Sequence, residues 1–358
     1  TNLSEEAIEL LTATGFLRMA VDGTASGAGD QEAMRNQVMA DTIKIVSTSL
    51  LGLTVGCAQC HDHRYDPILQ ADYYRMRAVF EPAYDWNNWM PPSRRVVSLY
   101  TDADRAKAAE VSAEAAKLAE ERNKKQQEYI QIEFEKELLK FDEALREPLR
   151  AAFNPPDDKR TPEQKALLKR NPSANISGGT LYQYNQKAAD DIKRRDAEIA
   201  AVNARKPVED FLRVLTEVPG QVPETFVFHR GDHRQPKEKV EPAGLTIAAP
   251  PGHRFEIPAD DPDLSTSGRR TAFAAWLTSG THPLVTRVLV NRVWMHHFGK
   301  GLVETPADFG AMGQKPTHPE LLDWLAAEFA AENWSLKRLH KLIMLSTAYR
   351  QTSLRDGN

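Results

Sequence analysis

This chain lacks three features by which large classes of proteins are recognised. No stretch approaches the roughly 20 apolar residues that a helix needs to cross a bilayer, so the sequence predicts no transmembrane segment. The first residues, TNLSEEAIELL, have neither the basic start nor the apolar run of a signal peptide. The formal net charge of −4 lacks the basic excess that binds phosphate backbones, and the basic residues are spread along the chain, so we expect no nucleic-acid partner.

The chain begins at Thr1 rather than at an initiator Met, from which we expect that a leader or an upstream domain has been removed. Its 358 residues are enough for two or three domains, and a hydrophobic share of 41% is enough to fill their cores. The sequence therefore predicts a globular protein.

Apolar residues recur at helical spacing through most of the chain, which predicts a mainly α-helical fold. The pattern at 31–53 predicts a helix that ends just before the only cysteines, and 71–80 predicts an amphipathic helix just after them. From 102 to about 153 the composition changes to Ala, Glu, Lys and Gln, with apolar residues at three- and four-residue intervals, which predicts one long, charged helix. After a Pro-, Asn- and Gly-rich break the helical pattern resumes at 181–204. We expect these two segments to form a long antiparallel hairpin, most simply a solvated spacer or interaction arm.

The remaining sequence differs from this arm in composition. Residues 207–260 hold eight prolines and short β-type runs at 225–232 and 244–250, which predict a few short strands in an extended connection. Helical patterns return at 269–280, 283–299 and 318–350, the last split at Asn333 with Ser335 as an N-cap. The expected organisation has four segments: a cysteine-containing domain at 1–100, a charged helical hairpin arm at 101–206, a Pro-rich connection with short strands at 207–262 and a helical C-terminal domain at 263–358.

Both cysteines of the chain stand in one motif, GCAQCHDHRYDP, at 56–67. Cys57, Cys60 and His61 satisfy C-x-x-C-H, the attachment pattern of c-type haem. Two thiols at this spacing on a helical turn reach both vinyl groups of one porphyrin as thioethers, and the adjacent imidazole is placed under the iron. The motif therefore predicts covalent haem c, with His61 as the proximal iron ligand.

Three other interpretations of the cysteine pair remain open. A thioredoxin-type disulfide would need a strand before the motif, whereas the preceding segment has a helical pattern. Zinc would draw on the two cysteines, His61 and His63, but four ligands within seven residues crowd a tetrahedron and the chain has no second cysteine pair. The third interpretation is two unreactive thiols. We favour haem over all three.

The second iron ligand is less clearly marked. His63 lies too close to His61 to reach the opposite haem face, so we expect a structural or supporting role, bonded to Asp66 or to a propionate. Met90 is the first distal candidate, because thioether ligands of electron-transfer cytochromes come from later loops. Met76 is a further candidate.

His296 and His297 are the other distal candidates. Adjacent residues on a helix diverge by about 100°, so at most one of the two approaches the iron or a propionate. We expect the C-terminal domain to pack against the motif helices, with 290–299 nearest the cofactor.

Residues 50–80, which contain the motif, resemble the haem-motif domain of the secreted planctomycete cytochrome-c-domain proteins. Residues 272–310 and 317–353 look like the second, planctomycete-specific domain of the same proteins, and the similarity extends to 13–19 and 229–242. The hairpin is outside it and looks like a variable insert. The resemblance implies haem and an extracytoplasmic location, periplasmic or secreted. It implies no reaction, because the family consists largely of domains of unknown function.

Three functions are compatible with these observations. The first is an extracytoplasmic c-type haem protein that transfers electrons or performs one-electron chemistry, with a redox partner protein or other secreted domains as partners. The second is a haem enzyme, peroxidase-like or oxidising an exported polymer, with an open distal site. The third is a non-redox scaffold in which the motif is structural or binds zinc.

Overall fold

The computed structural model describes residues 2–250 and 252–352, so Thr1 and 353–358, which belong to the first and last expected segments, lie outside the described residues. The fold is mainly α-helical, as predicted, with only two small sheets among these residues. The chain forms two compact units, which we call the arm (1–3 and 98–210) and the body (4–97 and 211–358). None of the described helices is both long enough and apolar enough to span a membrane.

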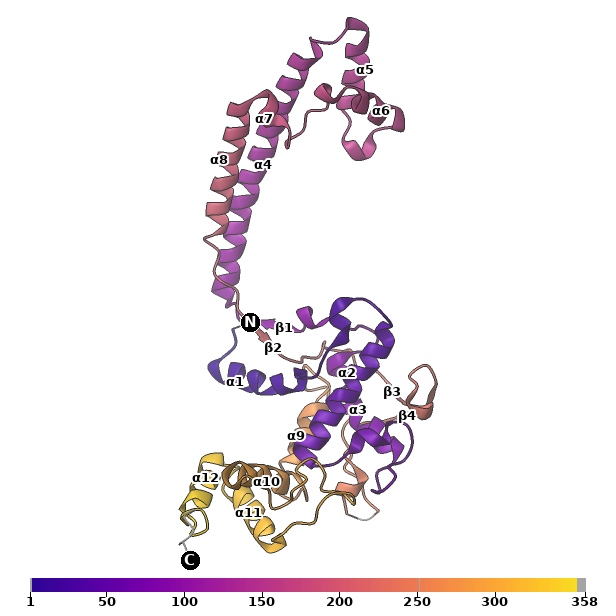
Figure 1. Ribbon diagram of the computed structural model, residues 1–358, viewed down its shortest axis with the longest axis vertical. Helices are drawn as coiled ribbons and strands as arrows, with labels where there is room; N and C mark the ends of the chain where they lie inside the picture. The colour runs from indigo at the N-terminus through magenta and orange to yellow at the C-terminus, as the bar shows by residue number, and fades with distance from the viewer. Residues whose placement is uncertain (1, 251, 353–358) are drawn as a thin grey trace, which may run out of the picture. The chain divides into compact units, whose positions relative to one another are not determined.

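The arm is built on two long antiparallel helices (Figure 1), α4 (Asp102–Leu138) and α8 (Gln186–Asn203). Thr101 and Asp104 form a capping box that starts α4. Ion pairs join Glu114 of α4 to Arg205, just after α8, and Arg122 near the middle of α4 to Asp196 near the middle of α8, as an antiparallel pair requires. The predicted helical hairpin is confirmed.

The far end of the hairpin carries a small core of its own. The single helix predicted to run to about residue 153 is wrong, because α4 ends at Leu138 and a separate helix, α5 (Glu143–Phe153), follows. The expected break contains another helix, α6 (Pro162–Arg170), and a short α7 (Leu181–Tyr184) precedes α8. Phe134 stacks on Phe153 with ring centroids 3.8 Å apart, and both belong to one apolar cluster.

The body is built from helices of both ends of the chain, and its buried apolar residues form two clusters, the second of them within the C-terminal helices. Its early helices are α1 (Glu5–Ala13), α2 (Gln31–Val46), which a π-type turn at Ser47–Leu51 extends, and α3 (Gln70–Tyr84). Its late helices are α9 (Arg269–Leu277), α10 (Val285–Phe298), α11 (Pro319–Ala331) and α12 (Leu336–Leu345). One apolar cluster includes Ile43 of α2, Phe80 of α3 and Phe273 of α9.

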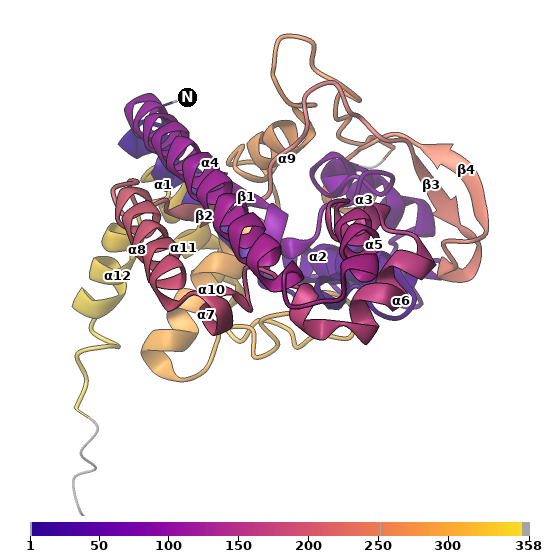
Figure 2. The same ribbon diagram turned by 90° about the horizontal axis from the view of Figure 1, so that it is seen from above.

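The strands of the body are short. β1 (Val96–Ser98) pairs with β2 (Phe211–Arg213), where the chain passes into and out of the arm. β3 (Thr225–Phe228) and β4 (Pro236–Val240) lie side by side (Figure 2) as an antiparallel pair. The second predicted β-type run, 244–250, is not a strand: it contains a 3₁₀ turn at Thr246–Ala248.

Candidate functional site

The cysteine motif sits on a 3₁₀ turn, Val55–Gln59, between α2 and α3. The side chains of Val55 and Ala58 are fully buried and anchor this turn in the body core. Cys57 and Cys60, by contrast, are free cysteines and exposed. The turn therefore presents two accessible sulfur nucleophiles from a rigid base.

Residues distant in sequence hold the end of this turn. The backbone carbonyl of Gln59 accepts hydrogen bonds from Gln70 Nε2 and from the Tyr74 hydroxyl, both at 3.0 Å. The same Gln70 Nε2 donates to the carbonyl of Phe228 in β3, also at 3.0 Å. Burial raises the pKa of Tyr74, so its hydroxyl remains protonated and keeps its proton for this bond.

The contact that His61 makes determines its tautomer. Its Nδ1 lies 2.6 Å from the backbone carbonyl oxygen of Asp62, and a carbonyl oxygen only accepts hydrogen bonds. Nδ1 therefore carries the proton, and the lone pair of Nε2 is free on an exposed side chain. Asp62 is itself held in place, because its Oδ1 accepts from the backbone N–H of Gln70 at 2.7 Å, the first residue of α3. An imidazole oriented in this way is suited to bind a metal through Nε2.

The second cysteine packs against a turn that requires glycine. Gly231 has a φ of 78°, in the left-handed region, and a Cβ placed on it would lie 2.9 Å from Cys60 Sγ. The turn after β3 thus leaves space for the sulfur that a side chain would fill.

His63 is turned into the protein. Its side chain is 5% exposed, Nε2 lies 3.1 Å from Thr54 Oγ1, and Nδ1 accepts the backbone N–H of Asp66 at 2.9 Å. An Nδ1 that accepts this bond carries no proton, so its 3.4 Å approach to the Asp66 carboxylate is not an ion pair. Both ring nitrogens are engaged, which speaks against His63 as a fourth zinc ligand. Among the described residues, no three His, Cys, Asp or Glu side chains are gathered as a metal site.

Asp66 connects the motif to the C-terminal part of the body. Its Oδ1 accepts the backbone N–H of Ala311 at 2.7 Å, and a Cβ on Gly310 would lie 2.5 Å from its Oδ2. One residue earlier, Phe309 donates its N–H to the carbonyl of Gly52 at 2.7 Å. The loop 309–311 therefore packs directly on the motif loop. The sequence gives no sign of this contact, because the two loops share no pattern.

The distal candidates lie in different places. Met76 is fully buried in α3, and Met90 follows the C-terminal end of that helix, where its carbonyl accepts from Arg95. Tyr74 is hydrogen-bonded to the motif, and Tyr84 is the last residue of α3. The helix rises 1.5 Å per residue, so these two residues are about 15 Å apart along its axis. This distance does not favour Met90 as the distal ligand of an iron that His61 binds.

The side chains of the two candidate histidines of α10 point in different directions, because adjacent residues on a helix are about 100° apart. His297 Nε2 lies 2.8 Å from Nδ1 of His340 in α12, so it is engaged among the C-terminal helices. His296 is exposed and follows Arg292 by one turn, and the guanidinium of Arg292 donates to the carbonyls of Thr48 and Pro306. His296 is thus the one of the pair on the face of α10 that meets the segment before the motif.

Two family models match parts of this chain, each about a quarter of its length. Residues 1–85 match PSCyt2, described as a protein of unknown function (DUF1549), and residues 269–358 match PSD1, described as a protein of unknown function (DUF1553). Both are planctomycete cytochrome-c-associated domain families. These two matches support the resemblance seen in the sequence. The PSCyt2 match contains the motif and the PSD1 match contains the loop 309–311, so the contact through Asp66 joins the two matched regions.

The search of curated proteins and the search of solved structures gave no match.

Proposed function

We propose that Cys57 and Cys60 carry a covalently attached c-type haem with His61 as the proximal iron ligand, and that the protein transfers electrons outside the cytoplasm. One observation carries the proposal: two exposed free thiols at C-x-x-C spacing precede an exposed imidazole whose Nε2 lone pair is free. When bound, the haem supplies reversible one-electron chemistry. Covalent attachment suits a location where lost cofactor cannot be recovered.

The residues of this chain have separate roles in the proposal. Val55 and Ala58 are buried in the core and anchor the turn that carries Cys57. The carbonyl of Asp62 holds the His61 proton on Nδ1 and leaves Nε2 to the iron. Gly231 keeps open the space beside Cys60. The expected partners are a redox protein or other secreted domains.

The test is to produce the chain in a host that attaches c-type haem, and to measure intact mass and the visible spectrum after acid–acetone extraction. We expect one haem adduct and a spectrum that survives extraction. The double variant Cys57→Ala/Cys60→Ala should lose both. His61→Ala should change the spectrum or prevent attachment, whereas His229→Ala, an exposed histidine in the turn beside Cys60, should do neither. An unmodified mass for the wild-type chain would refute the proposal and leave the scaffold function.

A haem enzyme with an open distal position is the second candidate. It is favoured by the placement of Met90 at the other end of α3 and by the engagement of His297 with His340. Cyanide added to the haem-loaded protein distinguishes the two. Rapid binding with a spectral shift supports the enzyme, and an unchanged spectrum supports a closed, electron-transfer site.

A further inference from the structure

A second site lies in the body, at the C-terminal end of α3 and away from the cysteine motif. A cavity of about 310 Å³ is lined by residues of the segment 15–22, of α2, of the loop after α3 and of β2. Its volume is at the lower end of the range for small-molecule sites, roughly 300–1,000 Å³. Three of its lining residues are arginines, Arg18, Arg95 and Arg213, and one is an aspartate, Asp22.

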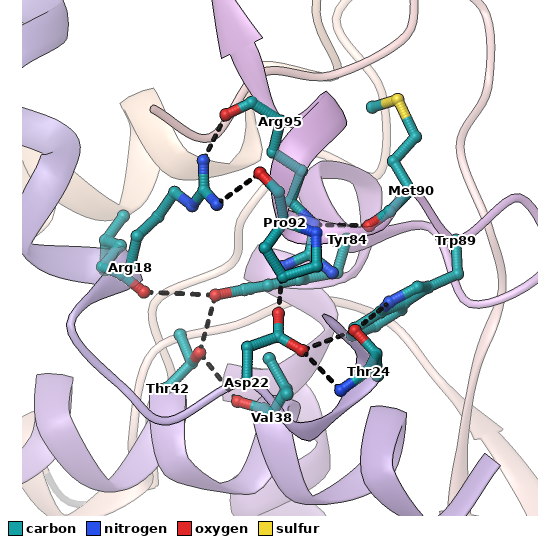
Figure 3. A network of polar contacts seen from close by, with 11 residues as sticks. Arg18, Asp22, Thr24, Val38, Thr42, Tyr84, Trp89, Met90, Pro92 and Arg95 are labelled. Carbon is teal, nitrogen blue, oxygen red and sulfur yellow. Dashed lines mark hydrogen bonds and ion pairs between the residues drawn. The ribbon is translucent and has the colours of Figure 1, made fainter. Parts of the chain in front are cut away.

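Arg95 is the most deeply buried of the three, at 4% exposed. Its side chain belongs to a network of polar contacts that includes Asp22 and Met90 (Figure 3). Its Nε donates to the carbonyl of Met90 and one terminal nitrogen to Asp22, both at 2.7 Å. Its guanidinium stacks over Trp89 and Tyr84 at 4.5 and 5.2 Å. The other terminal nitrogen, Nη2, is buried and has no hydrogen-bond partner among the described residues. A buried charged donor without a partner is costly, so this group is expected to have an acceptor in the working protein.

Arg18 adds a second guanidinium, which donates to the carbonyls of Pro92 and Arg95. A backbone carbonyl accepts such a hydrogen bond but is neutral, so these two contacts do not balance the positive charge of Arg18. Burial, together with the nearby positive charge of Arg95, lowers the pKa of Arg18. The charge of Arg18 is thus not neutralised by its neighbours.

Arg213 of β2 completes the set at the rim of the cavity, where it is exposed. No ion pair involves Arg213 within 2–250 and 252–352. The carboxylate of Asp22 is bonded to Arg95 and to the backbone N–H of Thr24. The remaining titratable neighbour, the Tyr84 hydroxyl, donates to the Leu17 carbonyl and has its pKa raised by burial, so it adds no negative charge. Three positive charges therefore face one negative charge.

We infer that this cavity binds a small anion through its carboxylate or sulfate group, with Arg18, Arg95 and Arg213 as the ligand-binding residues. The unpartnered Nη2 of Arg95 can donate a charge-assisted hydrogen bond to such an oxyanion, and the positive charges of Arg18 and Arg213 attract it. Leu17, Val38 and the Tyr84 ring supply apolar walls for a compact body attached to the anionic group. This site is independent of the proposed haem function.

The test is to titrate the complete chain with acetate, benzoate and sulfate at constant ionic strength, and to follow the six tryptophan indole N–H signals by NMR. Trp89 contacts Arg95, so its indole signal should shift saturably while the more distant indoles shift little. If benzoate binds more tightly than acetate, the ligand of this cavity is a carboxylate attached to an apolar group. If sulfate binds more tightly than both carboxylates, the ligand is a sulfate or a sulfate ester.

Arg213→Gln and Arg94→Gln form a matched pair, because both arginines are exposed and only Arg213 lines the cavity. We expect Arg213→Gln to weaken binding about ten-fold, the effect of losing one charge-assisted bond, and Arg94→Gln to change it less than two-fold. Two results would overturn the inference. One is the absence of saturable shifts with all three anions, and the other is equal weakening by the two substitutions, which would indicate general surface charge.

Discussion

The ion pairs of the arm are mostly exposed, whereas the body also contains an ion pair that is almost completely buried. In the arm, ion pairs such as Lys107–Glu110 and Lys124–Glu120 join exposed residues one helical turn apart. In the body, Arg77 is fully buried, pairs with Glu81 at 3.0 Å and lies over the rings of Trp86 and Phe228. Exposed pairs of the first kind contribute little to stability, about 0–1 kcal/mol. A buried charge of the second kind is strongly destabilising if its partner is removed.

The two units also differ in reactive residues. Both cysteines, all ten histidines and all six tryptophans of the chain lie in body positions, and the arm residues 98–210 contain none of the three types. The candidate cysteine motif and every histidine therefore lie in the body. Tryptophan fluorescence reports on the body alone, which makes the comparison testable unit by unit.

The largest effect is expected from Phe134→Ala in the arm. Phe134 is fully buried and stacked on Phe153, and removing such a side chain costs about 3–5 kcal/mol. In a urea titration followed by far-UV circular dichroism, part of the helix signal of the variant should be lost at a lower urea concentration than in the wild type. The midpoint of the transition measured by tryptophan fluorescence, which reports on the body, should not change. Ile132→Ala is the control, because Ile132 lies on the same helix and is 50% exposed. A joint shift of both transitions would show that the arm and the body unfold as one unit.

The next largest effect is expected from Asn291→Ala in the body. Asn291 is fully buried, and its amide bonds both backbone groups of Val303, accepting the N–H at 2.8 Å and donating to the carbonyl at 2.9 Å. Two buried backbone groups lose their partner, so we expect a loss of about 2–4 kcal/mol in the free energy of unfolding by tryptophan fluorescence. His296→Ala, exposed on the same helix, should cost less than about 0.5 kcal/mol in the haem-free protein. A loss below about 1 kcal/mol would mean that water replaces the amide.

Acidification should weaken the body before the arm. Burial lowers the pKa of His282 from 6.5 to about 4. The unfolded chain takes up a proton below pH 6.5 and the folded chain does not, so the body loses stability as the pH falls from about 6.5 to 4, by up to about 3 kcal/mol. In the arm, hydrogen bonds from Arg194 and Arg195 lower the pKa of Asp191 from 3.8 to about 2, so its contribution is present above pH 3.8 and is lost only below it.

His282→Asn isolates the contribution of His282. An asparagine oxygen can replace Nδ1 as the acceptor for the N–H groups of Leu284 and Val285, but it does not titrate. The difference in unfolding free energy between wild type and variant should therefore decrease as the pH falls from 6.5 to 4. A difference independent of pH would show that His282 is protonated equally in both states.

The sequence predicts those features of the fold that depend on nearby residues, such as the ends of helices. The split in 318–350 is confirmed: Asn333 and Trp334 have positive φ, and the Ser335 hydroxyl accepts the N–H of Arg338 to start α12. The helix α6 was missed although Thr161 and Gln164 form a capping box around Pro162, because the prolines and asparagines nearby suggested a loop. The start of α6 was therefore marked in the sequence by its capping box.

Other features could not be predicted from the sequence. The apolar run at 244–250 suits a strand, but strand formation also requires a partner, and the described residues beside this run form only the bridge between Ala243 and Glu256. At the candidate site, the motif itself was visible, whereas the tautomer of His61 and the contact of Asp66 with Ala311 depend on the folded backbone. The three arginines of the cavity likewise meet only through the fold, since Arg18, Arg95 and Arg213 share no sequence motif.

The smallest effect on the body is expected from removing most of the arm. The two ends of the arm meet, because Leu99 donates its N–H to the carbonyl of Asp210 at 2.9 Å and the Tyr100 hydroxyl donates to Pro207. A short Gly/Ser linker in place of 102–204 can therefore close the gap without strain on the body. The urea midpoint measured by tryptophan fluorescence should stay within error of the wild-type value, and haem attachment, under the proposed function, should be unchanged. Loss of haem from a body that unfolds normally would show that the arm contributes to the cofactor site.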